Sequence, residues 1–147
     1  MIMLCYPEGD DRGKSAQTSF SALYENEKYV IGLAFPKTGR QHQIRSHGAH
    51  HGFPLVGDKP DPGGKELFGR FKDENATKED HDLMQIPRHA LHALALGINL
   101  QGEQKKFIGQ FPQDFKDWMA KYTEAKVDEV EAKAKLMASD YISSSLR

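Results

Sequence analysis

The sequence lacks several features that define common classes of protein. It has a single cysteine, Cys5, which excludes an internal disulfide and a cysteine zinc cage. The longest apolar run, near residues 91–96, is far shorter than the roughly 20 residues that span a bilayer. The N-terminus does not combine a basic start, an apolar core and a small-residue cleavage site, so no export signal is expected. These absences predict a soluble, cytoplasmic protein.

An excess of charge of one sign is also lacking. The 147 residues carry 20 Lys and Arg against 21 Asp and Glu, a net charge of −1, whereas a dedicated nucleic-acid binder is usually basic. The local distribution differs, because residues 36–59 hold four cations, four histidines and one acid. A basic segment on a neutral protein fits contact with phosphate, and it equally fits a solvated face.

Hydrophobic periodicity indicates both strands and helices in the first third of the chain. Side chains alternate with period two over residues 17–24 and 28–35, which predicts a β-hairpin that ends at Pro36. Residues 41–51 have helical spacing, and Gly52 is a typical C-terminal stop, so a helix is expected there.

The middle of the sequence is harder to assign. Residues 57–80 are rich in glycine, proline and charge, and they predict a long loop of the kind that is often functional or mobile. Residues 89–98 fit a helix by their Ala and Leu content. Context favours a strand, since residues 105–111 look like its hairpin partner across a turn at Gly102.

The C-terminal part predicts an amphipathic helix over residues 113–138, with a weak point near Thr123 and a frayed tail over 139–147. Its apolar positions recur at helical spacing: Phe115, Trp118, Met119, Tyr122, Val127, Val130, Ala134 and Met137. A stripe of methionine and aromatic residues at this spacing is typical of core packing rather than of a cofactor site.

The segment with the most chemical information is residues 37–47, followed by residues 52–58. A strand ends, a tight Thr-Gly turn follows, and Arg40 and Arg45 stand five positions apart. Guanidinium groups can hold a carboxylate or a phosphate bidentately, and a helix N-terminus beside them supports an anion. The residue pattern alone favours a surface turn with solvated charges over such an anion site.

The same segment resembles the third conserved motif of the RluA family of RNA pseudouridine synthases, T-G-R-x-H-Q-I-R-x-H followed by G-x-P-I-x-G-D. Residues 38–47 and 52–58 match it. Residues 14–18 resemble the family's K-x-A-x-T strand entry, and residues 88–93 resemble its R-x-A-L-H-A strand. Residues 111–115 resemble its terminal L-P-x-D segment. Four motifs in the family's order make this a specific resemblance.

The resemblance implies an α+β fold, with a mixed, mainly antiparallel sheet and flanking helices. An amphipathic C-terminal helix would follow this partial catalytic domain in the chain. The expected organisation is an irregular lead-in over residues 1–13, a partial pseudouridine-synthase-like catalytic domain over 14–115, and the C-terminal helix with its tail over 116–147.

The resemblance also implies an activity, which is the isomerisation of uridine to pseudouridine in structured ribosomal or transfer RNA, with no metal and no cofactor. The target uridine is flipped out of its stack. By position, Arg45 would pair with the family's essential catalytic aspartate, and Ile44 would form part of the pocket wall. Contacts with RNA would come from Lys37, Arg40, His42 and Gln43, the last three also shaping the turn.

The sequence departs from the family in one large respect. The H-R-L-D-x-x-T-S-G motif that holds the catalytic aspartate does not occur, and neither His-Arg nor Leu-Asp occurs as a dipeptide. The family's upstream tyrosine motif is missing too, and Asp58 fits the structural Gly-Asp of the third motif. The chain thus resembles the second half of the catalytic domain and would be a fragment, a split gene product or a degenerate relative.

Two functions follow from this departure. The chain is a truncated synthase domain that is inactive alone and needs a missing N-terminal half with the aspartate, or it is a non-catalytic RNA-binding or protein-interaction module. Unpaired strand edges of a cut sheet also predict self-association.

A histidine-rich metal-binding protein is a third, weaker interpretation. His47 and His51 are four residues apart, which would place both on one helix face. No H-E-x-x-H arrangement accompanies them, and the resemblance accounts for His47, so no metal site is expected.

Overall fold

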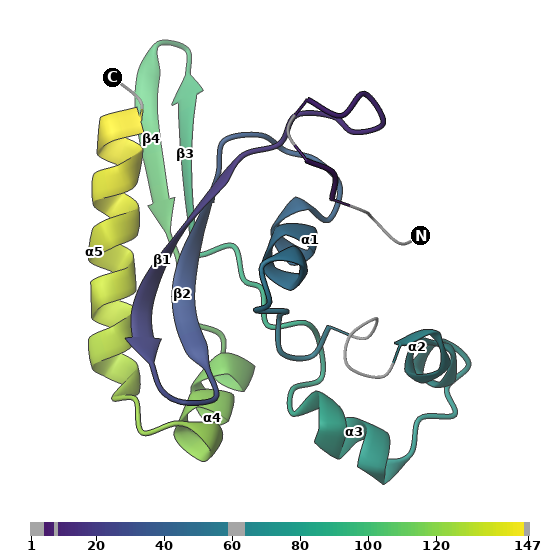
Figure 1. Cartoon of the computed structure of the whole chain (residues 1–147). Helices are drawn as coiled ribbons and strands as arrows, with labels where there is room; N and C mark the ends of the chain where they lie inside the picture. The colour runs from purple at the N-terminus through teal and green to yellow at the C-terminus, as the bar shows by residue number, and fades with distance from the viewer. Residues whose placement is uncertain (1–4, 8, 59–63, 146–147) are drawn as a thin grey trace. The chain divides into compact units, whose positions relative to one another are not determined.

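The computed structural model describes residues 5–7, 9–58 and 64–145 and combines helices with antiparallel pairs of strands (Figure 1). This confirms the expected α+β class, including the helix at the C-terminal end. The elements are β1 (Thr18–Glu25), β2 (Val30–Pro36), α1 (Gln43–His50), α2 (Gly64–Lys72), α3 (Lys78–Met84), β3 (Ala95–Leu100), β4 (Glu103–Ile108), α4 (Gln113–Tyr122) and α5 (Val127–Ser145).

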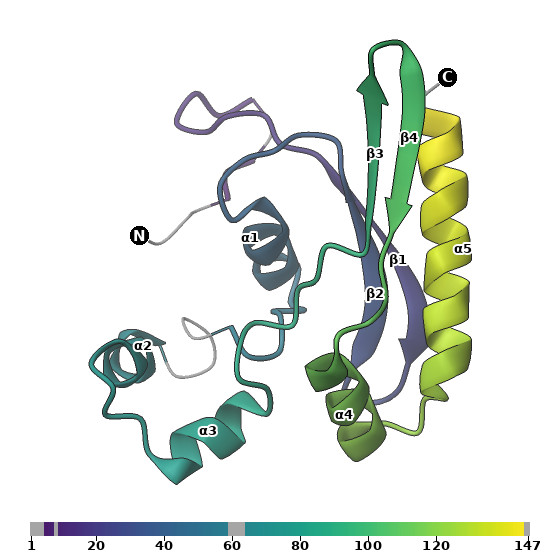
Figure 2. The ribbon, with the colours of Figure 1, turned by 180° about the vertical axis from the view of Figure 1, so that it is seen from behind.

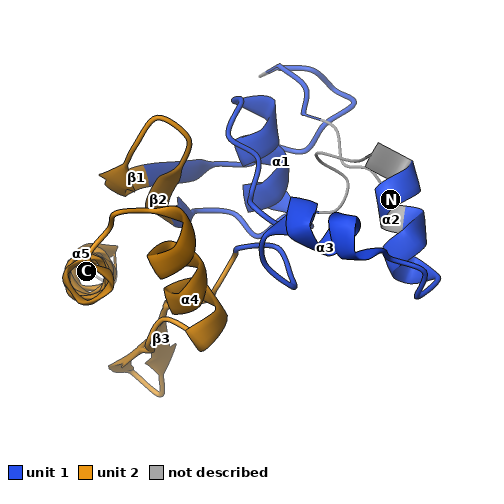
Figure 3. Ribbon diagram, turned by 90° about the horizontal axis from the view of Figure 1, so that it is seen from below, with its two compact units in different colours: residues 1–20, 34–90 blue, residues 21–33, 91–147 orange. Residues whose placement is uncertain are grey.

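The chain divides into two compact units (Figure 3). Unit 1 consists of residues 1–20 and 34–90, and unit 2 consists of residues 21–33 and 91–147. The division into segments 1–13, 14–115 and 116–147 stays a prediction about domain organisation.

The predicted first hairpin is confirmed, with β1 and β2 paired in a two-stranded sheet. Its turn is fixed by Asn26, whose side-chain oxygen accepts hydrogen bonds from the backbone N–H groups of Lys28 and Tyr29 at 2.9 and 2.8 Å. An Asn that bonds to the backbone two or three residues later is a common turn former. Pro36 ends β2, as expected.

The second hairpin confirms the strand assignment for the later part of residues 89–98. Strands β3 and β4 pair antiparallel from Ala95 opposite Ile108 to Leu100 opposite Glu103. The connecting residues Gln101 and Gly102 both have positive φ, 54° and 85°, which a type I′ turn requires. Residues 91–94 precede the strand without regular structure.

The C-terminal helix is interrupted where the sequence predicted a weak point. Thr123 is extended, and both its backbone N–H and its hydroxyl donate to the carbonyl of Met119, which closes α4. Helix α5 continues to Ser145, so the frayed tail is wrong for residues 139–145, because Ile142 is 8% exposed and anchors the last turns. Residues 146–147 lie outside the described part.

The core of unit 2 forms where α5 packs along the β3–β4 hairpin (Figure 2). Leu94, Ala134 and Ala138 are buried together, and half-buried side chains pack against them: Leu23, Leu33, Ala95 and Phe111. The small side chains of Ala134 and Ala138 let α5 lie close to the β3–β4 hairpin. On β1 the half-buried Leu23 faces this core, whereas Phe20 and Ala22, which alternate with it, are exposed.

The long loop expected over residues 57–80 is wrong, because α2 and the first three residues of α3 lie there. A capping box starts α3: the Thr77 hydroxyl accepts from the N–H of Asp80, and the Asp80 carboxylate accepts from the N–H of Thr77. Arg70 of α2 donates two hydrogen bonds to the same carboxylate at 2.7 and 2.6 Å. Residues 59–63 lie outside the described part. Among the described helices, none is long and apolar enough to cross a membrane.

Candidate active site

Helix α1 lies in unit 1, within the helix predicted over residues 41–51, and begins at Gln43. It starts late because His42 adopts a left-handed conformation, with φ 55° and ψ 18°. It ends at His50, and the predicted stop, Gly52, follows the C-cap His51 with φ 85°. The turn and the helix together hold six of the side chains that the sequence singled out: Lys37, Arg40, His42, Gln43, Ile44 and Arg45.

Gln43 ties this turn to the start of β1. Its carbonyl oxygen accepts from the Thr38 hydroxyl at 2.8 Å and from the Arg40 N–H at 3.0 Å. Its amide nitrogen donates to the Gln17 carbonyl and to the Thr18 hydroxyl, both at 2.9 Å. The side chain is 6% exposed, so these bonds satisfy a buried amide and join two of the sequence motifs physically.

Arg45 and Asp58 form a bidentate ion pair. The Nε of Arg45 donates to Asp58 Oδ2 at 2.8 Å, and Nη2 donates to Oδ1 at 2.5 Å. The Arg45 side chain is 21% exposed and that of Asp58 is 10% exposed. The hydrogen bonds to Asp58 raise the pKa of Arg45 above its ordinary value, so the guanidinium stays charged. Such a fork fixes both the position and the plane of the guanidinium.

A left-handed glycine places Asp58 in reach of the helix. Gly57 has φ 73°, and a Cβ there would lie 2.3 Å from the Arg88 carbonyl oxygen and 2.6 Å from Cγ2 of Ile86. The Ala90 N–H also donates to the Val56 carbonyl at 2.7 Å. The Gly-Asp pair of the third motif therefore packs closely on the segment that begins the R-x-A-L-H-A motif.

Two histidines border the ion pair. Nη1 of Arg45 lies 3.1 Å from Nδ1 of His42, and because a guanidinium can only donate, Nδ1 is the acceptor. The pKa of His89 is lowered, first by partial burial and next by the positive charge of Arg45. His89 was missed as a site residue, since it is separated from Arg45 by 44 positions and no spacing rule connects the two.

The remaining candidate residues divide by exposure. Lys37, Arg40 and His42 are exposed, with Arg40 Nε donating to the Ser15 carbonyl at 3.2 Å and His42 Nδ1 bonded to Arg45. Ile44 is half-buried on α1. Gln43 is enclosed by its four partners, which fits its expected part in shaping the turn.

No group of three or more metal-ligating side chains comes together in the part of the chain that the structure describes. His47 and His51 lie four positions apart at the end of α1, where the His51 N–H donates to the His47 carbonyl. Two imidazoles without a third ligand do not make the tetrahedral site that zinc prefers.

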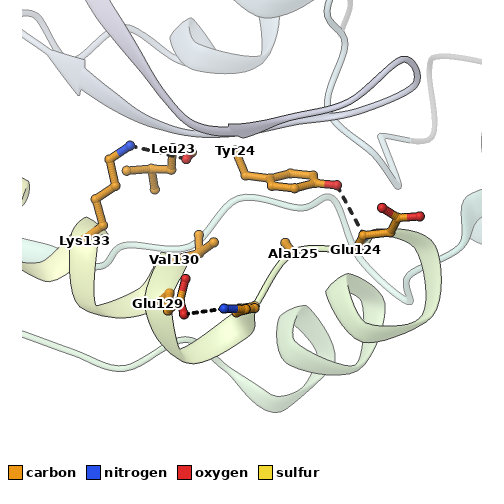
Figure 4. A pocket seen from close by; sticks show the side chains of 8 residues that line it. Leu23, Tyr24, Glu124, Ala125, Glu129, Val130 and Lys133 are labelled. Carbon is orange, nitrogen blue, oxygen red and sulfur yellow. Dashed lines mark hydrogen bonds and ion pairs between the residues drawn. The ribbon is translucent and has the colours of Figure 1, made fainter.

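Unit 2 carries a separate recess of about 310 Å³ between β1 and the start of α5 (Figure 4). The Tyr24 hydroxyl accepts from the Glu124 N–H at 3.3 Å, and Lys133 donates to the Leu23 carbonyl at 3.4 Å. Its charged side chains are of both signs and are largely paired with each other or with the backbone. The recess contains none of the motif residues discussed above.

Comparison with known proteins decides the family. Ribosomal large subunit pseudouridine synthase D of Borreliella burgdorferi is 36% identical over 106 residues, which are 71% of this chain and 28% of that protein. An uncharacterized RNA pseudouridine synthase of Zymomonas mobilis is 38% identical over 104 residues, 70% of this chain and 39% of that protein. This chain belongs to the RluA family of RNA pseudouridine synthases.

The RluA-family relatives are much longer than this chain. Synthase D of Pseudomonas aeruginosa is 34% identical over 107 residues, 71% of this chain and 32% of the relative. The chain thus spans about a third of the length of the curated relatives that it matches. No family model matches the chain, and no solved structure matches it.

Proposed function

We propose that this chain is the C-terminal part of the catalytic domain of an RNA pseudouridine synthase and that it acts on a uridine in structured RNA. Two of the relatives described above are named for the ribosomal large subunit, which favours ribosomal RNA as the substrate. In this proposal Arg45 is the residue of this chain that serves the reaction, and Ile44 lines the pocket for the uracil.

The orientation of Arg45 carries the proposal. A guanidinium has five N–H groups, and the bonds to Asp58 and His42 use three of them. Among the described residues no further acceptor takes the other two. Arg45 is therefore held in a fixed plane with two N–H groups available for a second carboxylate, such as the family's catalytic aspartate.

The proposed reaction is an isomerisation in which the atoms balance without a cofactor. The N1–C1′ bond of the uridine breaks, the uracil turns, and a C5–C1′ bond forms. The proton at C5 leaves to water and N1 gains one. A catalytic aspartate is needed for these steps, and none of the 147 residues lies in an H-R-L-D context. We therefore infer that the chain alone is inactive.

The test is a tritium-release assay on RNA labelled at C5 of uridine, because the isomerisation releases that hydrogen to water. The 147-residue chain is assayed alone and then together with a separately produced polypeptide that carries the H-R-L-D motif. We expect release only from the mixture. Release by the chain alone would show that a carboxylate within this sequence serves the reaction and would contradict the inferred inactivity.

A second candidate is a non-catalytic RNA-binding module, favoured by the absence of the H-R-L-D motif from the sequence. The same mixture distinguishes the two functions. If no supplied polypeptide restores release, while the chain still binds RNA with an affinity that falls as salt rises, the module is the better account.

A further inference from the structure

Four aromatic rings lie in series on unit 1, beside the candidate active site in sequence. Phe20 and Phe53 meet edge to face with centroids 5.6 Å apart, and Phe53 stacks on His51 at 6.1 Å with an interplanar angle of 17°. His51 in turn meets His50 edge to face at 5.2 Å. These four side chains, from β1, the end of α1 and the segment after it, are called the aromatic platform below.

The aromatic platform is exposed, although two of its members are apolar. Phe20 is 42% exposed and Phe53 is 46% exposed, and both histidines are exposed as well. A cluster that served only the core would hide these phenyl rings. Large rings that pack on each other yet keep their surfaces open to solvent offer area to a flat partner.

The backbone around the aromatic platform is fixed before any partner arrives. The Phe53 N–H donates to the Gly48 carbonyl at 3.0 Å, and a Cβ on Gly48 would lie only 2.9 Å from the Phe53 carbonyl oxygen. The left-handed Gly52, between His51 and Phe53, reverses the chain direction after α1. Rings held in this way lose little entropy when a partner stacks on them.

The charge around the aromatic platform selects an anionic partner. Residues 37–57 contain three cations and four histidines and no aspartate or glutamate. One of the cations, Arg45, is neutralised by Asp58, while Lys37 and Arg40 are exposed. Flat aromatic groups next to cations, without acids, suit a chain that carries planar bases on a phosphate backbone.

We propose that the aromatic platform stacks unpaired bases of RNA next to the target uridine, with Phe53 and His51 as its centre. The proposal rests on the proposed function and deepens it, because it assigns RNA contacts to residues outside the set Lys37, Arg40, His42 and Gln43. Stacking tolerates any base, so the aromatic platform adds affinity for splayed single strands rather than sequence specificity.

The test compares binding to a labelled single-stranded RNA of about 12 nucleotides, within the usual site size, with binding to an abasic strand of the same length. Fluorescence anisotropy is measured for the full chain and for Phe53→Leu and His51→Leu, which remove the ring but keep a side chain of moderate size. We expect each variant to weaken binding to the base-bearing strand about 5- to 50-fold. Binding to the abasic strand should change less than about twofold.

Two controls separate stacking from other effects. Phe107→Leu removes a ring that is 56% exposed on β4 of unit 2 and should leave binding to both strands unchanged. Lys37→Ala should weaken binding to both strands equally and reduce the salt dependence. A melting curve confirms that Phe53→Leu stays folded, and His51→Leu tests the same platform through a solvent-exposed side chain.

The inference is overturned if Phe53→Leu and His51→Leu bind the base-bearing strand as tightly as the Phe107→Leu control. It is also overturned if the unaltered chain binds the abasic strand as tightly as the base-bearing strand. Neither result affects the tritium-release assay, in which the reconstituted mixture is judged by turnover. A failure of the aromatic platform is thus distinguishable from a failure of the proposed function.

Discussion

At the scale of residues, the ion pair of Arg45 with Asp58 connects stability to the proposed chemistry. Both side chains are mostly buried, and two charge-assisted hydrogen bonds join them. We expect Asp58→Asn to lower the free energy of unfolding by about 2 kcal/mol, since it leaves the mostly buried Arg45 guanidinium without its counter-ion.

A double-mutant cycle with Arg45→Gln measures this interaction in urea denaturation. The two substitutions should be coupled by about 1–2 kcal/mol, so the double variant should be clearly more stable than the sum of the single losses predicts. Simple additivity would mean that the pair contributes nothing to folding.

Among the described glycines, Gly57 has the least room for an added side chain. Its φ of 73° strains any other residue, and an added Cβ would meet the Arg88 carbonyl oxygen at 2.3 Å. We expect Gly57→Ala to cost about 3 kcal/mol or more in the free energy of unfolding. Gly52→Ala is the matched control, because Gly52 has φ 85° with open space around it and should cost about 1 kcal/mol. Equal losses in the two variants, measured by thermal melting, would contradict the packing argument.

The candidate residues were predictable from the sequence to different degrees. Arg45 and Asp58 belong to one motif, but their contact depends on the left-handed turn at Gly57, which a residue pattern does not specify. Gln43 was expected both to shape the turn and to contact RNA, and its burial could be found only from its four partners. No sequence pattern marks His89 as a site residue, since it is 44 positions from Arg45 and only the fold brings the two together.

At the scale of elements, α4 and α5 are joined through Glu131. This carboxylate is 6% exposed, pairs with Lys116 and Lys135 at 2.7 and 2.8 Å, and accepts from the Phe111 N–H at 3.0 Å. The hydrogen bonds to the two lysines lower the pKa of Glu131 from 4.5 to about 2. A carboxyl group with a lowered pKa stabilises the fold fully above its ordinary pKa and loses that stabilisation as the pH falls.

We therefore expect the contribution of Glu131 to persist above about pH 4.5 and to decline between about pH 4.5 and 2. Glu131→Gln should lower the free energy of unfolding by about 2 kcal/mol at neutral pH. The difference in unfolding free energy between the variant and the unaltered chain should shrink as the pH falls. Because Asp80, whose pKa is also lowered, is present in both proteins, its contribution cancels in this comparison. A difference in unfolding free energy that does not change with pH would contradict the stabilising role of ionised Glu131.

Regular residue patterns predicted most strands and helices, and they failed over residues 57–80, where a helix cap and an ion pair fix the structure. The two hairpins, α1 and the break near Thr123 follow from alternation, helical spacing and turn residues. Helix α2 and the start of α3 were assigned to a loop because glycine, proline and charge dominate residues 57–80. The T-x-x-D pattern of the capping box was the available signal, and the bond from Arg70 to Asp80 completes it.

At the scale of the whole molecule, the chain spans about a third of its relatives and has open sheet edges. Within the described residues, each strand of the two sheets has one neighbour. Leu96, Leu100 and Phe107 of the second hairpin are more than half exposed. We expect self-association, seen as a sedimentation coefficient that rises with concentration, and a reduction of it by Phe107→Lys. A single monomeric species at all concentrations would contradict this prediction.

The most direct test of the central claim is the rate of tritium release by the reconstituted mixture at saturating protein, compared between the unaltered chain and Arg45→Ala. We predict that Arg45→Ala abolishes release while the affinity for RNA changes less than about twofold, because the charge of Arg45 is already neutralised by Asp58 and adds little attraction for phosphate. A folded Arg45→Ala variant that releases tritium at the unaltered rate would contradict the account. So would a loss of release that is fully explained by loss of folding, since Arg45 would then be a structural residue.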